Sequence, residues 1–266
     1  MPEEKNTGFS VLTADERLPA FALFSRIISE SRGINHDDAG RIARHAWGFI
    51  GENITETEAD KLVELCAVYG LNAIKKPAGA VQEPEPPLHI KKLVFSEGIL
   101  NYTDVSAGAG STDANALTLL AAAPVKEITT KTVKTREGPS SQEKAIRFGI
   151  MAVTGLPIGM GKSKEVKKEV TSSELSFCLD IISRPTAVRL RLSSNDFDFS
   201  CLKEKKTYSS QSNFRLLCAE LAAFAPAALK NAGLLAILES KPLAPLPYDS
   251  PDDYEQEILR LNNLIR

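Results

Sequence analysis

The sequence predicts an α+β protein in which a small, helix-rich α/β domain precedes a β-barrel-like domain that a C-terminal amphipathic helix closes. Two observations predict this order. Apolar residues recur with a helical period before residue 78 and with a strand period after residue 89. Residues 78–88 between them hold three prolines and show no periodicity, which is typical of a linker.

Length and composition indicate a globular, cytoplasmic protein. The 266 residues are 43% hydrophobic and 25% charged, with a net charge of −2, so the whole molecule has no strong field toward nucleic acid or membranes. No apolar run is long enough for a membrane span, and the charged start of the chain does not resemble a secretory signal. The four cysteines are dispersed among apolar residues, and we expect reduced, packed thiols at Cys66, Cys178, Cys201 and Cys218.

Residues 1–18 are expected to form a leader, and residues 19–77 a domain of three helices and one strand. The second helix has Asn35 or His36 as its N-cap, and the third begins at Thr55 with the form of a capping box. Glycine adopts the left-handed conformation that ends helices, and each predicted helix stops at one. These glycines are Gly33, Gly48 and Gly70. Residues 71–74 are predicted to form the strand.

Two runs carry a resemblance. Residues 31–39, Ser-Arg-Gly-Ile-Asn-His-Asp-Asp-Ala, and residues 69–74, Tyr-Gly-Leu-Asn-Ala-Ile, are similar to the C-terminal domain of the bacterial ribosomal stalk protein. The resemblance covers residues 20–77 and implies a small α/β sandwich. That family contacts translation factors through lysines near its glycine-rich turn, whereas Asn35, His36 and Asp37 occupy the turn here. The factor-binding role is therefore not transferred to this chain.

Residues 89–240 are predicted to form the second domain. Glu97-Gly98 separates two β-prone runs and indicates a hairpin, and residues 107–113 are expected to be a loop of small residues. Strands are predicted at 117–122, 125–129, 130–135, 174–183, 187–192 and 196–199. A helix capped by Ser212 or Asn213 follows and stops before Pro226, and a second short helix is predicted at 227–238.

Strands followed by one amphipathic helix resemble a pleckstrin-homology-like barrel, in which a C-terminal helix fills one open end. The runs at 197–202, 208–210 and 213–215 are similar to segments of uncharacterised bacterial members of such families. Residues 241–266 are expected to be a tail whose short helix begins at Ser250-Pro251, with Ser250 as N-cap and proline in the first turn.

The run Gly155 to Ser163 is close to a phosphate-binding P-loop but does not match it. The motif needs a glycine five residues before Gly161, and that position is Leu156. The following residues, 164–170, are too short a segment for the long helix that a P-loop opens. We therefore predict a glycine-rich turn between two strands, and nucleotide-dependent catalysis remains only an alternative.

Charge is unevenly distributed. Residues 126–168 contain ten lysines and arginines against four acids, a net charge of +6, whereas residues 1–88 carry a net charge of −5. A basic face of this kind would attract anionic lipids or nucleic acid. The alternative is that it contacts the acidic first domain of the same chain. The predicted ligand-binding residues are Lys134, Arg136, Lys162, Lys164, Lys167 and Lys168.

The residues that could support catalysis do not form a recognisable set. The three histidines do not cluster in the sequence, and His45 beside Trp47 is expected to be a partly buried packing residue. We therefore predict no catalytic residues, no metal and no cofactor.

The sequence thus predicts a non-catalytic binding or adaptor protein. Its partner is expected to be a protein or an anionic ligand, and an anionic membrane surface is one such ligand. A translation-linked or nucleic-acid-binding factor is the alternative, although nucleic acid is the less expected partner because Phe148 is the one aromatic residue among the lysines.

Overall fold

The computed structural model describes residues 8–137, 164–241 and 248–265, with side chains described outside 125–175. The chain divides into two compact units. Residues 1–125 and 176–266 form the body, and residues 126–175 form the second unit, the ribbon. In these described parts of the chain, no helix has the length and apolar composition to cross a membrane.

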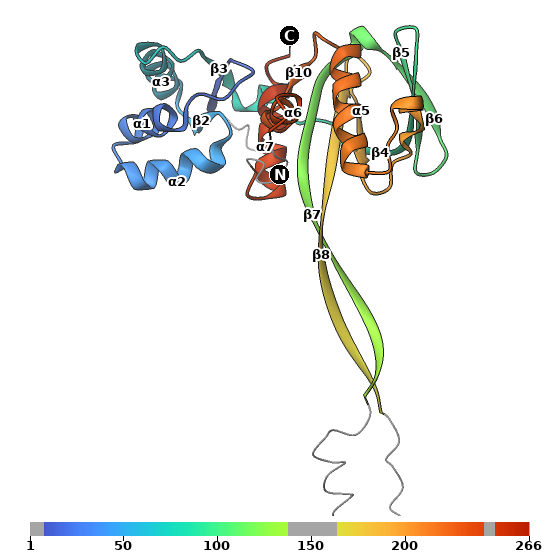
Figure 1. The fold of residues 1–266 in the computed structure, drawn as a ribbon. Helices are drawn as coiled ribbons and strands as arrows, with labels where there is room; N and C mark the ends of the chain where they lie inside the picture. Colours follow the sequence, from blue (N-terminus) through green and yellow to red (C-terminus); the bar gives the residue numbers. More distant parts are fainter. Residues whose placement is uncertain (1–7, 138–163, 242–247, 266) are drawn as a thin grey trace, which may run out of the picture. The chain divides into compact units, whose positions relative to one another are not determined.

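The N-terminal part of the body, residues 8–77, is a three-stranded antiparallel sheet with three helices, called here the first module (Figure 1). The sheet order is β2-β1-β3. The elements are β1 (Phe9–Thr13), α1 (Phe21–Arg32), α2 (His36–Ala46), β2 (Phe49–Ile54), α3 (Glu56–Val68) and β3 (Ala73–Pro77). The predicted leader is therefore wrong for residues 9–13, which form the central strand of the module. This strand pairs with β2 on one side and β3 on the other, and its residues Val11 and Leu12 are fully buried.

Local signals place the helices of the first module where the sequence predicts them. The Asn35 side chain accepts a hydrogen bond from the Asp38 amide, and Thr55 and Glu58 form both halves of a capping box. Gly33 ends α1 in the left-handed conformation, at φ 62°. The end of α2 differs from the prediction, since Trp47 itself is left-handed at φ 43° and Gly48 follows at φ 92°.

The remainder of the body contributes to a seven-stranded sheet whose order is β10-β7-β8-β9-β4-β5-β6. Its strands are β4 (Leu88–Ser96), β5 (Ile99–Asp104), β6 (Ala109–Asp113), β7 (Leu117–Glu137), β8 (Lys164–Ser183), β9 (Val188–Ser193) and β10 (Leu229–Lys230). The helices are α5 (Ser210–Phe224), α6 (Ala232–Leu238) and α7 (Pro251–Asn262). Three described 3₁₀ segments connect these elements, η1 (Ala78–Ala80) and η2 (Ala114–Ala116) between strands and η3 (Phe199–Lys205) between β9 and α5.

The mixed α/β architecture agrees with the predicted class, but the described strand pairings do not close a barrel. β10 is parallel to β7 and β4 is parallel to β9, and no described pairing joins the edge strands β10 and β6. The Glu97-Gly98 hairpin is confirmed, with both residues at positive φ as a two-residue turn requires.

Three element predictions in this region were wrong. Residues 109–113 form the edge strand β6 rather than a loop, because their backbone pairs with β5 over five residues. Residues 196–199 form a turn and the start of η3, since Asp198 caps that segment through the Ser200 amide. The N-cap of α5 is Ser209, and Asn213 instead bonds to Thr207 from inside the helix.

Two apolar clusters lie on opposite faces of this sheet. The larger one packs α5 and α6 against the face that bears Leu93, Leu179 and Leu192. The other packs α7 through Tyr254, Ile258 and Leu261 against the opposite face. Ser250 caps α7 with Pro251 in its first turn, as predicted, and this docked helix also reaches the first module.

Candidate functional site

The predicted basic residues fall in the ribbon or outside the described residues. Lys134 and Arg136 belong to β7, and Lys164, Lys167 and Lys168 belong to β8, in the stretches where the backbone alone is described. Lys162 and the P-loop-like run 155–163 lie outside the described residues. In the described backbone, β7 and β8 are neighbouring strands of the sheet, and each continues into the ribbon.

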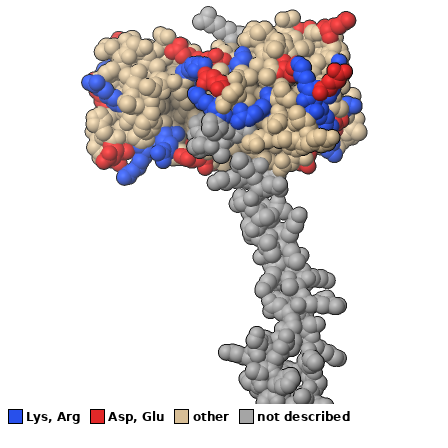
Figure 2. All heavy atoms as spheres, viewed as in Figure 1, with Lys and Arg blue, Asp and Glu red and all other residues tan. Residues whose placement is uncertain are grey.

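The body, in contrast, mixes its charges. Figure 2 shows blue and red side chains interspersed over the face drawn. Several surface cations have acidic partners, as in the pairs Arg17–Glu239 at 2.9 Å and Lys241–Glu239 at 2.7 Å. Exposed pairs of this kind contribute little free energy, but they reduce the net attraction of the surface for an anion.

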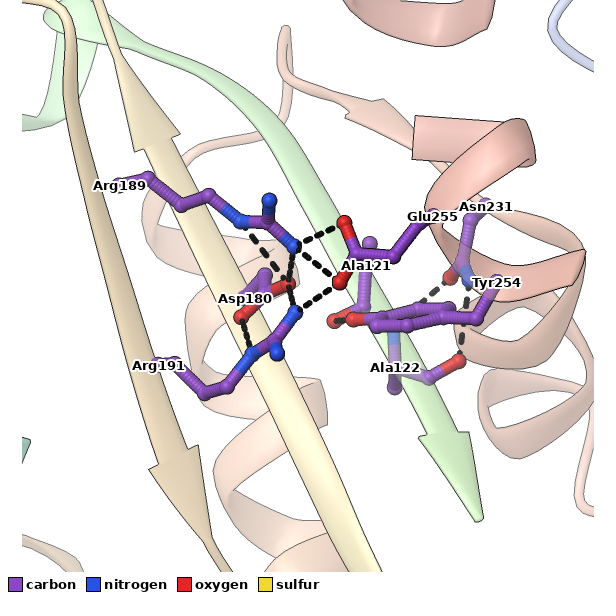
Figure 3. Close-up of polar contacts among 8 residues, drawn as sticks. All are labelled: Ala121, Ala122, Asp180, Arg189, Arg191, Asn231, Tyr254 and Glu255. Carbon is purple, nitrogen blue, oxygen red and sulfur yellow. Dashed lines mark hydrogen bonds and ion pairs between the residues drawn. The ribbon is translucent and has the colours of Figure 1, made fainter. Parts of the chain in front are cut away.

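A buried ionic cluster joins β8 and β9 to α7 (Figure 3). The Asp180 carboxylate is fully buried and accepts hydrogen bonds from Arg189, at 2.6 and 3.2 Å, and from Arg191, at 2.6 and 2.7 Å. Glu255 of α7 accepts from the same two arginines at 2.7–2.9 Å. Burial alone would lower the pKa of both arginines, but the two carboxylates outweigh it and raise that pKa. An acid engaged in this way is a structural group and not a free base.

A second buried cluster surrounds Arg260 of α7. Its guanidinium donates to backbone oxygens of the first module, to Asp15 at 2.6 Å and to Glu16 at 3.0 Å. The Glu257 carboxylate lies 3.9 Å from it and accepts hydrogen bonds from the Ala232 amide and the Tyr248 hydroxyl. Burial raises the pKa of Glu257 and lowers that of Arg260.

A third polar group lies where α2 ends and α7 begins. His45 Nδ1 is 2.9 Å from Asp253 Oδ1. One potential metal-binding atom from each of His45, Asp249 and Asp253 lies within 4.8 Å of the other two. The predicted partly buried role of His45 was wrong, because 58% of its side chain is exposed. The sequence did not reveal this group, because His45 lies more than 200 residues from the two aspartates along the chain.

Two grooves can be described among the placed residues of the body. One, of about 690 Å³, lies between residues 82–85 and the β8–β9 turn, and Arg184 and Arg189 are among its lining residues. The other, of about 890 Å³, lies between β4, η3 and the end of α5, where Phe95 meets Phe224. Both arginines in the first groove already bond to protein groups, Arg184 to Gln82 and Asn262 and Arg189 to Asp180.

All four cysteines are free thiols, as predicted, with Cys201 half-buried and the others buried. In comparisons with known proteins, no family model matches the chain, and neither curated proteins nor solved structures give a significant match.

Proposed function

We propose that this chain is a non-catalytic binding protein that contacts an anionic partner through the ribbon. One observation carries the proposal. The segment 126–168, with a net charge of +6, makes up most of the ribbon, which is a compact unit distinct from the body. Glu169 and Glu174 reduce the net charge of the whole ribbon to +4. Its described backbone is extended, so positive charge is distributed along two neighbouring strands. Such a distribution suits an extended anionic surface better than a small ligand.

The body supports the non-catalytic part of the proposal. Asp180, Glu255 and Glu257 of its described residues are engaged by arginine, tyrosine or backbone groups that hold helices and strands together. Catalytic acids and bases need a proton-accepting atom that faces substrate. These carboxylates instead act as packing groups.

The test compares binding of the full chain to vesicles of phosphatidylcholine with and without phosphatidylserine, over a series of salt concentrations. The variant replaces Lys134, Arg136, Lys162, Lys164, Lys167 and Lys168 with glutamine. Each basic residue near an anionic membrane surface contributes about 1 kcal/mol to the free energy of binding. We therefore expect the six substitutions to weaken binding by at least about 100-fold.

The matched control replaces six exposed lysines of the body with glutamine, at Lys61, Lys91, Lys92, Lys203, Lys205 and Lys206. This control has the same change in net charge and is expected to retain nearly all of the binding. Equal losses in the two variants would show that net charge, and not the ribbon, attracts the partner. Binding that does not change with salt would also contradict the proposal.

A nucleic acid is the second candidate partner, favoured by the shape of the described ribbon backbone. The major groove of B-DNA admits a two-stranded β-ribbon. The same two variants distinguish this candidate when duplex DNA and single-stranded RNA replace the vesicles. A steep fall of affinity with salt for DNA, together with no vesicle binding, would favour it.

The two family resemblances remain proposals. The order of elements in the first module is β-α-α-β-α-β, and a stalk-like domain is proposed there without its factor-binding role. The antiparallel strands β4, β5 and β6, and the position of α5 after the last long strand, support a pleckstrin-homology-like relationship for residues 89–240. The parallel β4–β9 and β7–β10 pairings are the departure from that all-antiparallel pattern.

A further inference from the structure

The end of α2 and the start of α7 bring together three side chains that could bind a metal ion. His45 lies in the last turn of α2, Asp249 precedes the N-cap of α7, and Asp253 lies in its first turn. One ligand atom from each residue lies within 4.8 Å of the other two. An ion about 2 Å from each ligand requires ligand separations of about 3.3 Å. The exposed Asp249 would therefore move inward, and the 2.9 Å hydrogen-bonded pair of His45 and Asp253 would open slightly to admit the ion.

Asp253 is fixed with one oxygen directed to the histidine. Its Oδ2 atom accepts hydrogen bonds from the Asp249 and Ser250 amides, at 3.2 and 3.0 Å. Its Oδ1 atom faces His45 Nδ1 at 2.9 Å. The side chain is 5% exposed, so two backbone donors rather than solvent orient it. One metal-binding oxygen is thus positioned before any ion arrives.

Trp47 supplies a second, independent observation. Its ring is buried, at 6% exposure, and stacks on Tyr248 at a centroid distance of 4.6 Å, which fixes its orientation. Its Nε1 atom forms no well-aligned hydrogen bond among the described residues, and the Asp253 carboxylate is the acceptor toward which it is directed. A buried N–H without an acceptor is costly, and a water held beside Asp253 would accept its hydrogen bond.

We propose that His45, Asp249 and Asp253 bind a divalent ion of the zinc class, with a water as the fourth ligand beside Trp47. Histidine nitrogen and aspartate oxygen are both zinc ligands, and three protein ligands with a water in the fourth position are typical of an open zinc site. The two carboxylate charges balance the charge of the ion. The site is independent of the ribbon and of its anionic partner.

Two neighbours oppose a cation here, the N-terminal end of α7 and Arg44, and acidic residues offset the first of them. The N-terminal end of α7 carries a partial positive charge, but Asp252 and Asp253 lie in its first turn. Arg44 Nε lies 3.9 Å from Asp249 Oδ2, in a weak and exposed pair. Because Arg44 competes for a ligand, its removal should strengthen binding of the ion.

The bound ion would link the first module to the tail helix. His45 belongs to the module, whereas both aspartates belong to the α7 segment, so coordination spans the junction that Arg260 also crosses. Ligands that bind only the folded state stabilise it by mass action. Zinc should therefore raise the melting temperature of the full chain.

The test is calorimetric titration of the metal-free full chain with zinc chloride at pH 7.5, with cobalt chloride as a spectroscopic probe. We expect one ion per chain and a cobalt spectrum typical of tetrahedral coordination. His45→Ala and Asp249→Asn should each weaken binding by at least about tenfold, and Arg44→Gln should strengthen it. Asp253 is not substituted, since it also caps α7 and its loss would weaken the fold.

Two matched controls keep the test decisive. Asp252→Asn removes the same charge from the first turn of α7, and His36→Ala removes another exposed histidine. Both should bind zinc within about twofold of the unmodified chain, because exposed charges that do not contact the ion contribute little. No binding at millimolar zinc, or binding that persists in both His45→Ala and Asp249→Asn, would overturn the site.

Discussion

At the scale of single residues, burial sets the chemistry of the cysteines. Desolvation raises the pKa of the Cys66 and Cys201 thiols to about 11 and that of Cys178 to about 12. Cys66 is fully buried and Cys201 is half-buried beside the groove at η3. Since the thiolate is the nucleophile, these cysteines are poorly reactive, and their role is packing.

Alkylation with iodoacetamide checks this directly at Cys201, the most accessible of the four. Near pH 8 its thiolate fraction should be about 100-fold below that of an unperturbed thiol, whose pKa is 9.0, and its reaction correspondingly slower. The rate should rise about tenfold per pH unit until pH approaches the pKa. Mass spectrometry of digested protein measures it, with urea-unfolded chain as the control. Rapid modification of Cys201 in the folded chain near pH 8 would contradict the raised pKa.

At the scale of elements, short-range capping places the helices. The Thr55 and Ser250 side chains each accept a hydrogen bond from the amide three residues on, and an acid at that position reaches back to the cap. These caps satisfy amides that a helix end would otherwise leave without a partner. They can be read from the sequence because every participant lies within four residues.

Thr55→Ala should lower the free energy of unfolding by about 1 kcal/mol, because the first turn of α3 loses its acceptor. Urea unfolding followed by circular dichroism measures the change. Thr57→Ala, an exposed position in the same turn, is the matched control and should change stability by less than about 0.5 kcal/mol. Similar losses in both variants would show that the cap is not the source of the effect.

At the scale of the whole molecule, α7 couples the first module to the large sheet. Its Arg260 donates to Asp15 and Glu16 in the module, and its Tyr254 hydroxyl donates to the Ala121 backbone in β7. Gly48 is required beside Arg260, because a Cβ there would lie 2.3 Å from the Arg260 Cδ atom. Module and sheet are thus expected to unfold together.

Arg260→Ala should separate these two parts. The substitution leaves Glu257 buried without its nearest cation and removes the donor to the module, a change that typically costs about 3–5 kcal/mol. Trp47, the single tryptophan, stacks on Tyr248 at the junction, so its fluorescence reports on the contact.

In urea, fluorescence and circular dichroism should change together for the unmodified chain. For Arg260→Ala, the fluorescence change should come first. Arg41→Ala, at an exposed position of α2, is the control. Coincident transitions in Arg260→Ala would show that the coupling does not depend on this residue.

The sequence by itself determined the local features of this protein. It predicted the three helices of the first module, the Glu97-Gly98 hairpin and the start of α7 at Ser250, because caps, glycine stops and turn residues act within a few positions. It also located the basic segment, since charge can be counted without a fold.

Only the tertiary structure decided how distant segments meet. The predicted leader is wrong at β1, because these five residues become a strand only by pairing with β2 and β3. The arginine cluster around Asp180 and the grouping of His45 with Asp249 and Asp253 depend on where α7 docks. Long-range pairing and buried charge depend on residues far apart in the chain, and no local pattern records which of them will come into contact.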